Sequence, residues 1–203
     1  MSDCTDQNPC TGTPLRVRRA DARRNEEALL DAAATVFAAA GVDAPIRQIA
    51  AQAGVGTATI YRHFPTRADL VIAVYRHQVE GLADAGPALL AASATPYAAL
   101  VQWIDLFVDF LVTKQGLAGI MQSGDPSVAV LHDYFLARLV PVCADLVARA
   151  AAQGEIRGDV QAVDLMRGVG SLCAGARSRH GFDARQLVGL LLTGLRVSAA
   201  GVS

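Results

Sequence analysis

The feature that most constrains this chain is residues 44–64, where a small residue, a glycine and two apolar residues follow one another at fixed spacings. Ala50 is small enough to lie where two short helices cross, and Gly54, four residues later, tolerates the positive φ that a sharp turn can require. Ile60 and Phe64 are four residues apart and therefore share one side of the second helix, which we expect to be buried. The spacing predicts a helix-turn-helix unit, the motif whose second helix enters the major groove of DNA.

The polar residues of the second helix fall on its remaining sides. Their hydroxyl, guanidinium and imidazole groups can hydrogen-bond to phosphates and to base edges. The predicted DNA contacts on this helix are Thr57, Thr59, Tyr61, Arg62 and His63. The alternative interpretation is a small helical hairpin within a larger core, in which Tyr61 and His63 are simply amphipathic.

Residues 49–70 resemble the N-terminal domain of the tetracycline-repressor (TetR/AcrR) family, and the specific resemblance covers roughly residues 23–76. The resemblance implies an all-helical homodimeric repressor that binds a near-palindromic operator and releases it when a small molecule enters the C-terminal domain. It also implies that the polar residues just named lie at the DNA and that Arg67, at the start of the next helix, meets a phosphate. Gly56 stands where the family often has a serine N-cap, and Ala58 where it often has glycine; glycine is still an acceptable cap.

Two further basic residues, Arg23 and Arg24, lie near the start of the first predicted helix, about residues 21–40. Positive charge at that end opposes the helix dipole, so the pair makes more sense if a DNA phosphate lies nearby. Residues 16–19 are also basic. They are either a solvated end of the chain or an arm that touches the DNA backbone or minor groove.

Helical periodicity and chain-breaking residues divide the sequence into four parts. We predict a flexible basic tail (1–20), a helix-turn-helix DNA-binding domain (21–66), a linking helix (67–87) and a helical ligand-binding and dimerisation domain (88–203). The predicted fold class is therefore all-α, with an N-terminal three-helix DNA-binding domain and a C-terminal helical domain. No segment shows the alternation of a strand.

The composition is that of a globular protein with a basic N-terminal third. Hydrophobic residues make up 52% of the 203 residues and charged residues 18%, enough for a large core and a buried partner surface. The formal net charge is −1, yet residues 16–76 contain nine arginines and six acidic residues. No apolar run is long enough to span a membrane and residues 1–14 have no signal-peptide stretch, so we expect a cytoplasmic location and no membrane partner. The four cysteines lack metal-ligand spacing, so we expect no metal site and no cofactor.

The last two predicted helices, about residues 159–179 and 184–199, carry leucines and valines together with glycines and alanines. Glycine inside a helix costs roughly 1 kcal/mol relative to alanine, and close approach of another helix can offset that cost. The family's dimer forms here, as a four-helix bundle from two subunits. The predicted homodimer interface consists of Leu165, Val169, Leu172, Ala176, Leu187, Leu191, Gly194 and Leu195.

The middle of the C-terminal domain gathers aromatic residues near a helix that Pro141 should kink and near a glycine-broken segment, residues 114–124. A cavity there would be mostly apolar and would suit a small hydrophobic or aromatic effector. The predicted lining residues are Trp103, Phe107, Phe110, Gln122, His132, Tyr134 and Phe135. The alternative is an ordinary core, because aromatic residues at helical spacing usually just pack.

Three functions compete. The leading one is a ligand-responsive DNA-binding regulator, a repressor released from a palindromic operator by a small molecule. The second is an effector-independent DNA-binding or architectural protein. The third is a small helical enzyme with His132 and Asp133 as an acid/base pair, but adjacent helical residues point about 100° apart, and no nucleophile elbow or phosphate-binding loop is present. The sequence therefore predicts that the protein is not an enzyme.

Overall fold

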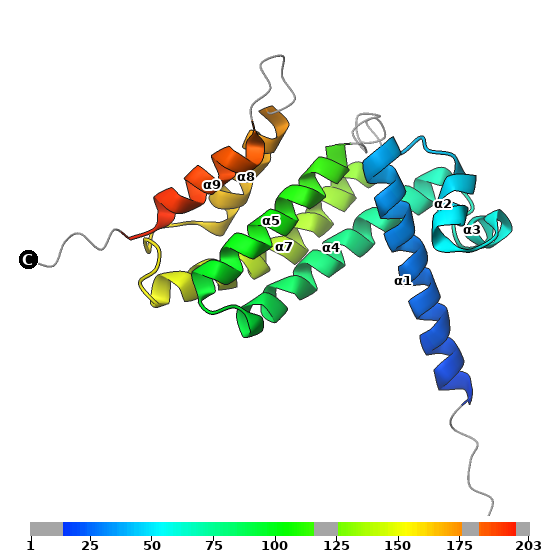
Figure 1. Ribbon diagram of the computed structural model, residues 1–203, viewed down its shortest axis with the longest axis horizontal. Helices are drawn as coiled ribbons and strands as arrows, with labels where there is room; N and C mark the ends of the chain where they lie inside the picture. The colour runs from blue at the N-terminus through cyan, green and yellow to red at the C-terminus, as the bar shows by residue number, and fades with distance from the viewer. Residues whose placement is uncertain (1–13, 116–125, 176–182, 198–203) are drawn as a thin grey trace, which may run out of the picture.

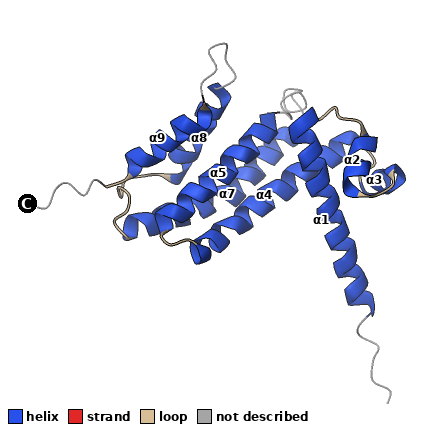
Figure 2. Ribbon diagram, viewed as in Figure 1, coloured by secondary structure: helices blue, strands red, loops and turns tan. Residues whose placement is uncertain are grey.

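The computed structural model of the protein describes residues 14–115, 126–175 and 183–197. Every named element in these ranges is an α-helix (Figure 2), which confirms the all-α prediction. The helices are α1 (Pro14–Ala40), α2 (Ile46–Ala53), α3 (Thr57–His63), α4 (Arg67–Ala92), α5 (Pro96–Gln115), α7 (Pro126–Ala152), α8 (Ala162–Gly175) and α9 (Ala184–Leu195). None of the described helices combines the length and the apolar character that crossing a membrane requires.

The first helix is longer than the sequence analysis predicts. α1 begins at Pro14, so residues 14–20, expected to be part of a flexible tail, are helical. Proline is favoured in the first turn because its fixed φ suits the helix and its missing N–H has no partner there. The leucine, arginines and alanine that follow are good helix formers.

The N-terminal three helices pack around a small apolar core. Phe37 of α1, Ile49 of α2 and Ile60 of α3 are each at most 3% exposed. Gly41, with φ +80°, directly follows the end of α1, and Gly54, with φ +67°, directly follows the end of α2. Both glycines occupy the left-handed region that other residues rarely adopt, as predicted for the turn between the two short helices.

α4 links this N-terminal unit to the rest of the protein and extends further than predicted. Thr66 and Asp69 form a capping box at its start, and the helix continues through Pro87 to Ala92 instead of ending at residue 87. Packing explains the continuation. Gly86 is buried, and a Cβ at this position would overlap Val142 Cγ1 of α7, so α7 approaches α4 closely where a side chain would separate them.

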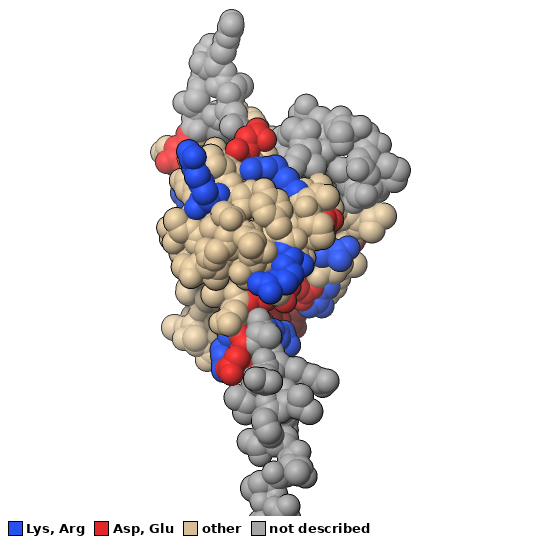
Figure 3. Space-filling view, turned by 90° about the vertical axis from the view of Figure 1, so that its right-hand side faces the viewer, with Lys and Arg blue, Asp and Glu red and all other residues tan. Residues whose placement is uncertain are grey.

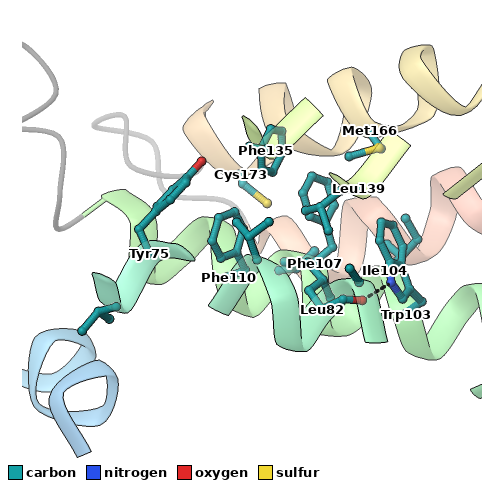
Figure 4. Close-up of a cluster of buried hydrophobic side chains, with 14 of the residues drawn as sticks. Tyr75, Leu82, Trp103, Ile104, Phe107, Phe110, Phe135, Leu139, Met166 and Cys173 are labelled. Atoms are coloured by element: carbon teal, nitrogen blue, oxygen red, sulfur yellow. Dashed lines mark hydrogen bonds between the residues drawn. The ribbon is translucent and has the colours of Figure 1, made fainter. Parts of the chain in front are cut away.

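α4, α5 and α7 run alongside one another, and α8 and α9 cover α5 and α7 at the end away from α2 and α3 (Figure 1). The centre is aromatic. Figure 4 shows Trp103, Phe107 and Phe110 following one another along α5, with Phe135 of α7 facing them and Trp103 Nε1 donating a hydrogen bond of 2.9 Å to the Leu82 carbonyl of α4.

The last two helices are shorter than predicted. α8 begins at Ala162 and not at Asp159. Before it, Ile156 pairs with Arg196 in an isolated β-bridge, residues 158–159 form a turn, and the Asp159 carboxylate accepts hydrogen bonds from Arg157. α9 ends at Leu195. Asp183 caps α9 as predicted, accepting a hydrogen bond of 2.9 Å from the Arg185 backbone N–H.

Candidate nucleic-acid interface and ligand cavity

The second helix of the helix-turn-helix unit, α3, buries one side and presents the other. Ile60 is 1% exposed and Phe64, directly after the helix, is 7% exposed. At helical spacing, Ala58 and Arg62 lie on the opposite side, and both are exposed. Tyr61 beside them is 53% exposed, and Arg62 Nη2 donates a 3.3 Å hydrogen bond to Thr59 Oγ1. Four of the predicted DNA contacts, Thr57, Tyr61, Arg62 and His63, are exposed, and Thr59 is half-buried.

The charge distribution at this end of the molecule is uneven. Figure 3 looks onto the end that carries α2 and α3, and arginine side chains surround a broad area without charged groups, while acidic side chains lie near its margins. An uncharged centre with basic edges is suited to DNA, because base edges are read by neutral donors and acceptors while arginines meet the phosphates.

Arg67, which is predicted to meet a phosphate, also has hydrogen-bond partners within the protein. Its half-buried guanidinium donates hydrogen bonds to the carbonyls of Val42 and of Ala44, the latter at 2.7 Å. Those carbonyls belong to the turn between α1 and α2, where no helix supplies an N–H partner. Arg67 thus ties the start of α4 to this turn and fixes how the DNA-facing helices sit on the linking helix.

Arg23 and Arg24 lie more than two turns into α1, which begins at Pro14, and not near its start as predicted, so the helix dipole gives no argument for a phosphate beside them. Each pairs with an acidic neighbour one turn away. Arg23 Nε lies 2.9 Å from Glu27 Oε1, and Arg24 pairs with Asp21. All four side chains are largely exposed. Exposed pairs of this kind contribute about 0–1 kcal/mol, so a phosphate can compete for either arginine at little cost.

One exposed basic residue of the helix-turn-helix unit is not among the predicted DNA contacts. Arg47 is exposed in the first turn of α2, and the structure records no ion pair for it among the described residues. Its position in the sequence could have indicated a DNA contact. In a helix-turn-helix unit the helix before the recognition helix crosses the DNA backbone.

A cavity of about 390 Å³ lies between α5, α7 and α8. Of the predicted lining residues, Phe107, His132 and Phe135 line it. Further lining residues on α5 and α7 are Leu111, Leu136 and Val140, and those on α8 are Val163, Met166, Arg167, Gly170, Ser171 and Ala174. The contribution of α8 was missed because its small residues were all attributed to dimerisation.

The other predicted lining residues lie elsewhere. Trp103 and Phe110 are buried behind the cavity, stacked on Phe107 at centroid distances of 5.6 and 6.5 Å. Tyr134 faces α4, and Gln122 lies outside the described residues. The aromatic side chains of α5 pack against one another and fill the space between α4 and α7. The cavity therefore lies on the α8 side of these aromatic residues and not, as predicted, among them.

An ion-pair cluster joins α7 to α4 on the side away from the cavity. The Glu80 carboxylate of α4 accepts hydrogen bonds from Arg138, whose Nε lies 2.8 Å from Glu80 Oε1, and from the Tyr134 hydroxyl. Arg76 lies over the Tyr134 ring, 5.5 Å from its centroid. The hydrogen bonds from Arg138 and Tyr134 hold the pKa of Glu80 below its usual value. We call Arg76, Glu80, Tyr134 and Arg138 the α4–α7 cluster.

The predicted dimer-interface residues fall into two groups. Leu165 and Val169 are at most 5% exposed, so they belong to the protomer's own core and are not available to a partner subunit. Four leucines are half-buried and Gly194 is exposed; Ala176 lies outside the described residues. These leucines are Leu172, Leu187, Leu191 and Leu195. Leu190, which the sequence analysis left out, is 63% exposed and shares a side of α9 with Leu187, Leu191 and Gly194.

Two family models match the chain. The model for bacterial regulatory proteins of the tetR family matches residues 29–74, and the model for the C-terminal domain of SbtR-like transcriptional regulators matches residues 95–197. No curated protein is detectably similar in sequence.

Solved structures agree with this match. A TetR transcriptional regulator from Streptomyces coelicolor is 34% identical over 86% of this chain and 99% of its own, with a TM-score of 0.74. A TetR regulatory protein from Mycobacterium vanbaalenii is 32% identical over 89% and 99%, with a TM-score of 0.69. A putative transcriptional regulator from Saccharomonospora viridis, solved in complex with choline, shares the fold at 22% identity over 88% and 99%, with a TM-score of 0.63.

Proposed function

This chain belongs to the TetR family of bacterial transcriptional regulators, and from that premise we propose that it is a homodimeric repressor whose palindromic operator is released by a small molecule. The observation that carries the proposal is the exposed side of α3, where Ala58, Tyr61 and Arg62 point away from the buried Ile60. Arginine binds guanine edges, and an alanine methyl contacts the methyl group of thymine. We propose the cytoplasm, where the DNA is, as its location.

The direct test is selection of binding sites from random duplex DNA with the purified protein. The expected result is a palindrome whose half-sites lie about one helical turn apart or slightly more. Binding without any enriched motif, lost at moderate salt, would contradict the proposal and favour an effector-independent architectural protein.

For the dimer, we propose the exposed side of α9, centred on Leu190. A Cβ at Gly189 or Gly194 would meet no atom of the described residues within 4 Å. Within the described part of the protomer the space beside these glycines is therefore open, and a second copy of α9 can approach closely. A dimer built there would use a surface that the protomer leaves uncovered, together with the half-buried Leu187 and Leu191.

Leu190→Arg is expected to raise the dimer dissociation constant at least about tenfold, because the two-fold axis would bring two buried like charges together. Sedimentation velocity over a concentration series measures this. Leu106→Arg is the matched control, since Leu106 of α5 is 43% exposed and faces α4 beside Gln78. If Leu190→Arg remains as dimeric as this control, the dimer interface does not include Leu190.

For signal transmission, we propose that α7 acts as the connection between cavity and DNA. His132, Phe135 and Val140 line the cavity from one side of α7, and Tyr134 and Arg138 hold Glu80 of α4 from another. A ligand that prefers one position of α7 would thereby shift α4, and α4 carries the DNA-binding unit through Arg67. Such a ligand changes operator affinity only by its differential affinity for the two positions.

The α4–α7 cluster makes a prediction about pH. The pKa of Glu80 is lower in the folded protein than its usual value of 4.5, so its stabilisation is complete above that value and is lost as the pH falls through the lower folded pKa. We expect Glu80→Gln to reduce the free energy of unfolding at pH 7 by about 0.2–1 kcal/mol, the range of exposed pairs.

Urea unfolding should show this difference shrinking below pH 4.5. Asp145→Asn, which removes the Asp145–Arg149 pair within α7, is the control; a pH-independent difference for Glu80→Gln would contradict the assignment.

A further inference from the structure

The polar groups around the cavity share one sign of charge. Arg167, His132 and Ser171 are the polar residues among those that line it, and the described lining contains no aspartate or glutamate. The remaining lining residues are apolar or glycine. A ligand in this site therefore meets a mostly apolar wall, one fixed positive charge, one imidazole and one hydroxyl.

These groups are not spread evenly. Met166 is 5% exposed and forms the inner part of the α8 wall, whereas the Arg167 side chain is 73% exposed and lies at the solvent edge. Ser171 is one turn from Arg167 and donates a 3.0 Å hydrogen bond to the Arg167 carbonyl, which places both polar side chains on the same edge of α8. The site thus has an apolar interior and a cationic rim.

The rim arginine is weakly held. Arg167 Nη1 lies 3.4 Å from Asp164 Oδ1, and the Asp164 side chain is 70% exposed. An exposed contact this long contributes little, so the guanidinium can turn toward a ligand. A guanidinium can bind a carboxylate with two parallel hydrogen bonds, as it can a phosphate, and a carboxylate is the anion that a small, mostly apolar molecule carries with the least added polar volume.

The aromatic residues do not form a cage for a cation. Phe107, Phe110 and Phe135 stack on one another at interplanar angles of 12–23° and centroid distances of 5.7–6.5 Å, and Trp103 stacks on Phe107 at 16°. A quaternary ammonium needs open aromatic faces, and these faces are covered by neighbouring rings. Arg167 would in addition repel a cation.

The size of the cavity limits the ligand. About 390 Å³ lies near the lower end of the range for small-molecule sites, about 300–1,000 Å³. The space reaches the backbone of α8, since a Cβ at Gly170 would meet no atom of the described residues within 4 Å. The ligand is therefore a small molecule whose apolar part faces Gly170 and Met166.

We propose that the cavity between α5, α7 and α8 binds a small organic acid, with its apolar body between Phe107, Phe135 and Met166 and its carboxylate at Arg167. This inference rests on the proposed function, in which the cavity holds the effector, and adds the chemical class of that effector. A site of this kind differs from a site for a cation. The similar structure from Saccharomonospora viridis was solved in complex with choline, which is a cation.

The test uses three probes with the same tail and different heads: decanoate, decanol and decyltrimethylammonium, each below its micelle concentration. Trp103 is the single tryptophan of the chain and stacks on Phe107 of the cavity wall, so its fluorescence reports occupancy of the full-length protein. We expect decanoate to bind at least about tenfold more tightly than either other probe. Equal binding of decanol, or tighter binding of the cation, would overturn the inference, as would absence of binding by all three.

Variants locate the binding. Arg167→Gln should weaken decanoate at least about tenfold and change decanol less than about twofold. Arg149→Gln removes an exposed arginine of α7 outside the cavity and should change neither. At Gly170, alanine should leave binding in place, whereas leucine should fill the cavity and abolish it. Decanoate binding that survives both Arg167→Gln and Gly170→Leu would place the probe elsewhere and overturn the inference.

Operator binding separates this inference from the proposed function. If decanoate binds with the expected dependence on Arg167 and also weakens operator binding, both are supported. If decanol or the cation binds best and releases the operator, the chemical class is wrong and the regulator remains. If decanoate binds as expected but the protein selects no palindromic DNA, the site stands and the proposed function fails.

Discussion

Replacing Arg62 with alanine should nearly abolish operator binding and leave the protomer folded. Arg62 is exposed on the side of α3 opposite Ile60, and the hydrogen bond recorded for it goes to Thr59 on the same helix at 3.3 Å, so the fold loses little. A bidentate arginine–base contact is worth about 1–3 kcal/mol. A dimer loses two of them, roughly a 30-fold to more than 1,000-fold loss of affinity.

Fluorescence anisotropy with the selected operator, measured at several salt concentrations, checks this result. Arg149→Ala is the control, because Arg149 is an exposed arginine on α7, far along the chain from α3. A loss that is uniform across sequences and reduces the salt slope would identify Arg62 as a phosphate contact. Unchanged operator affinity would show that α3 does not read the DNA.

Gly86→Ala should destabilise the protein by about 1–3 kcal/mol, the usual cost of overpacking. The added Cβ would overlap Val142 Cγ1. Val142 cannot easily turn away, because valine in a helix is held largely to one rotamer, and Trp103 closes the other side through its hydrogen bond to Leu82. α4 and α7 would therefore have to move apart.

Gly81→Ala is the matched control in the same helix. A Cβ there would meet no atom within 4 Å, so the substitution should stabilise α4 by about 0.5–1 kcal/mol through helix propensity alone. Urea unfolding followed by circular dichroism compares the two variants, at protein concentrations that keep the dimer population fixed. A Gly86→Ala protein as stable as Gly81→Ala would show that α4 and α7 do not meet closely.

The helix-turn-helix unit could be predicted in detail because its constraints are local. Ala50, Gly54 and Ile60 act within a stretch of eleven residues, and each has one physical role that few residue types can fill. The positive φ of Gly54 and the burial of Ile60 follow from those roles. Once the buried side of α3 is known, the remaining side chains of the helix are predicted to be exposed.

The differences arise where distant segments meet. Pro87 reads as a helix end, yet Gly86 lets α7 pack against a helix that continues. The sequence does not reveal that the carbonyls of the α1–α2 turn accept hydrogen bonds from Arg67. Leu165 carries the same pattern as an interface leucine but is buried by its own protomer. Helical periodicity predicts that a side chain is buried. It does not predict whether the side chain is buried by its own protomer or by a partner subunit, because that depends on the tertiary packing.

The position of α7 between two different neighbours has a consequence for design. Its cavity side and its α4 side use different residues, with Phe135 and Val140 on one and Tyr134 and Arg138 on the other. The polar rim is contributed largely by α8, which makes no direct contribution to α3 or to the α4–α7 cluster. The chemistry that is sensed and the DNA that is read can therefore be altered independently, so changes at Arg167 and Ser171 could retune this protein as a biosensor while its promoter stays the same.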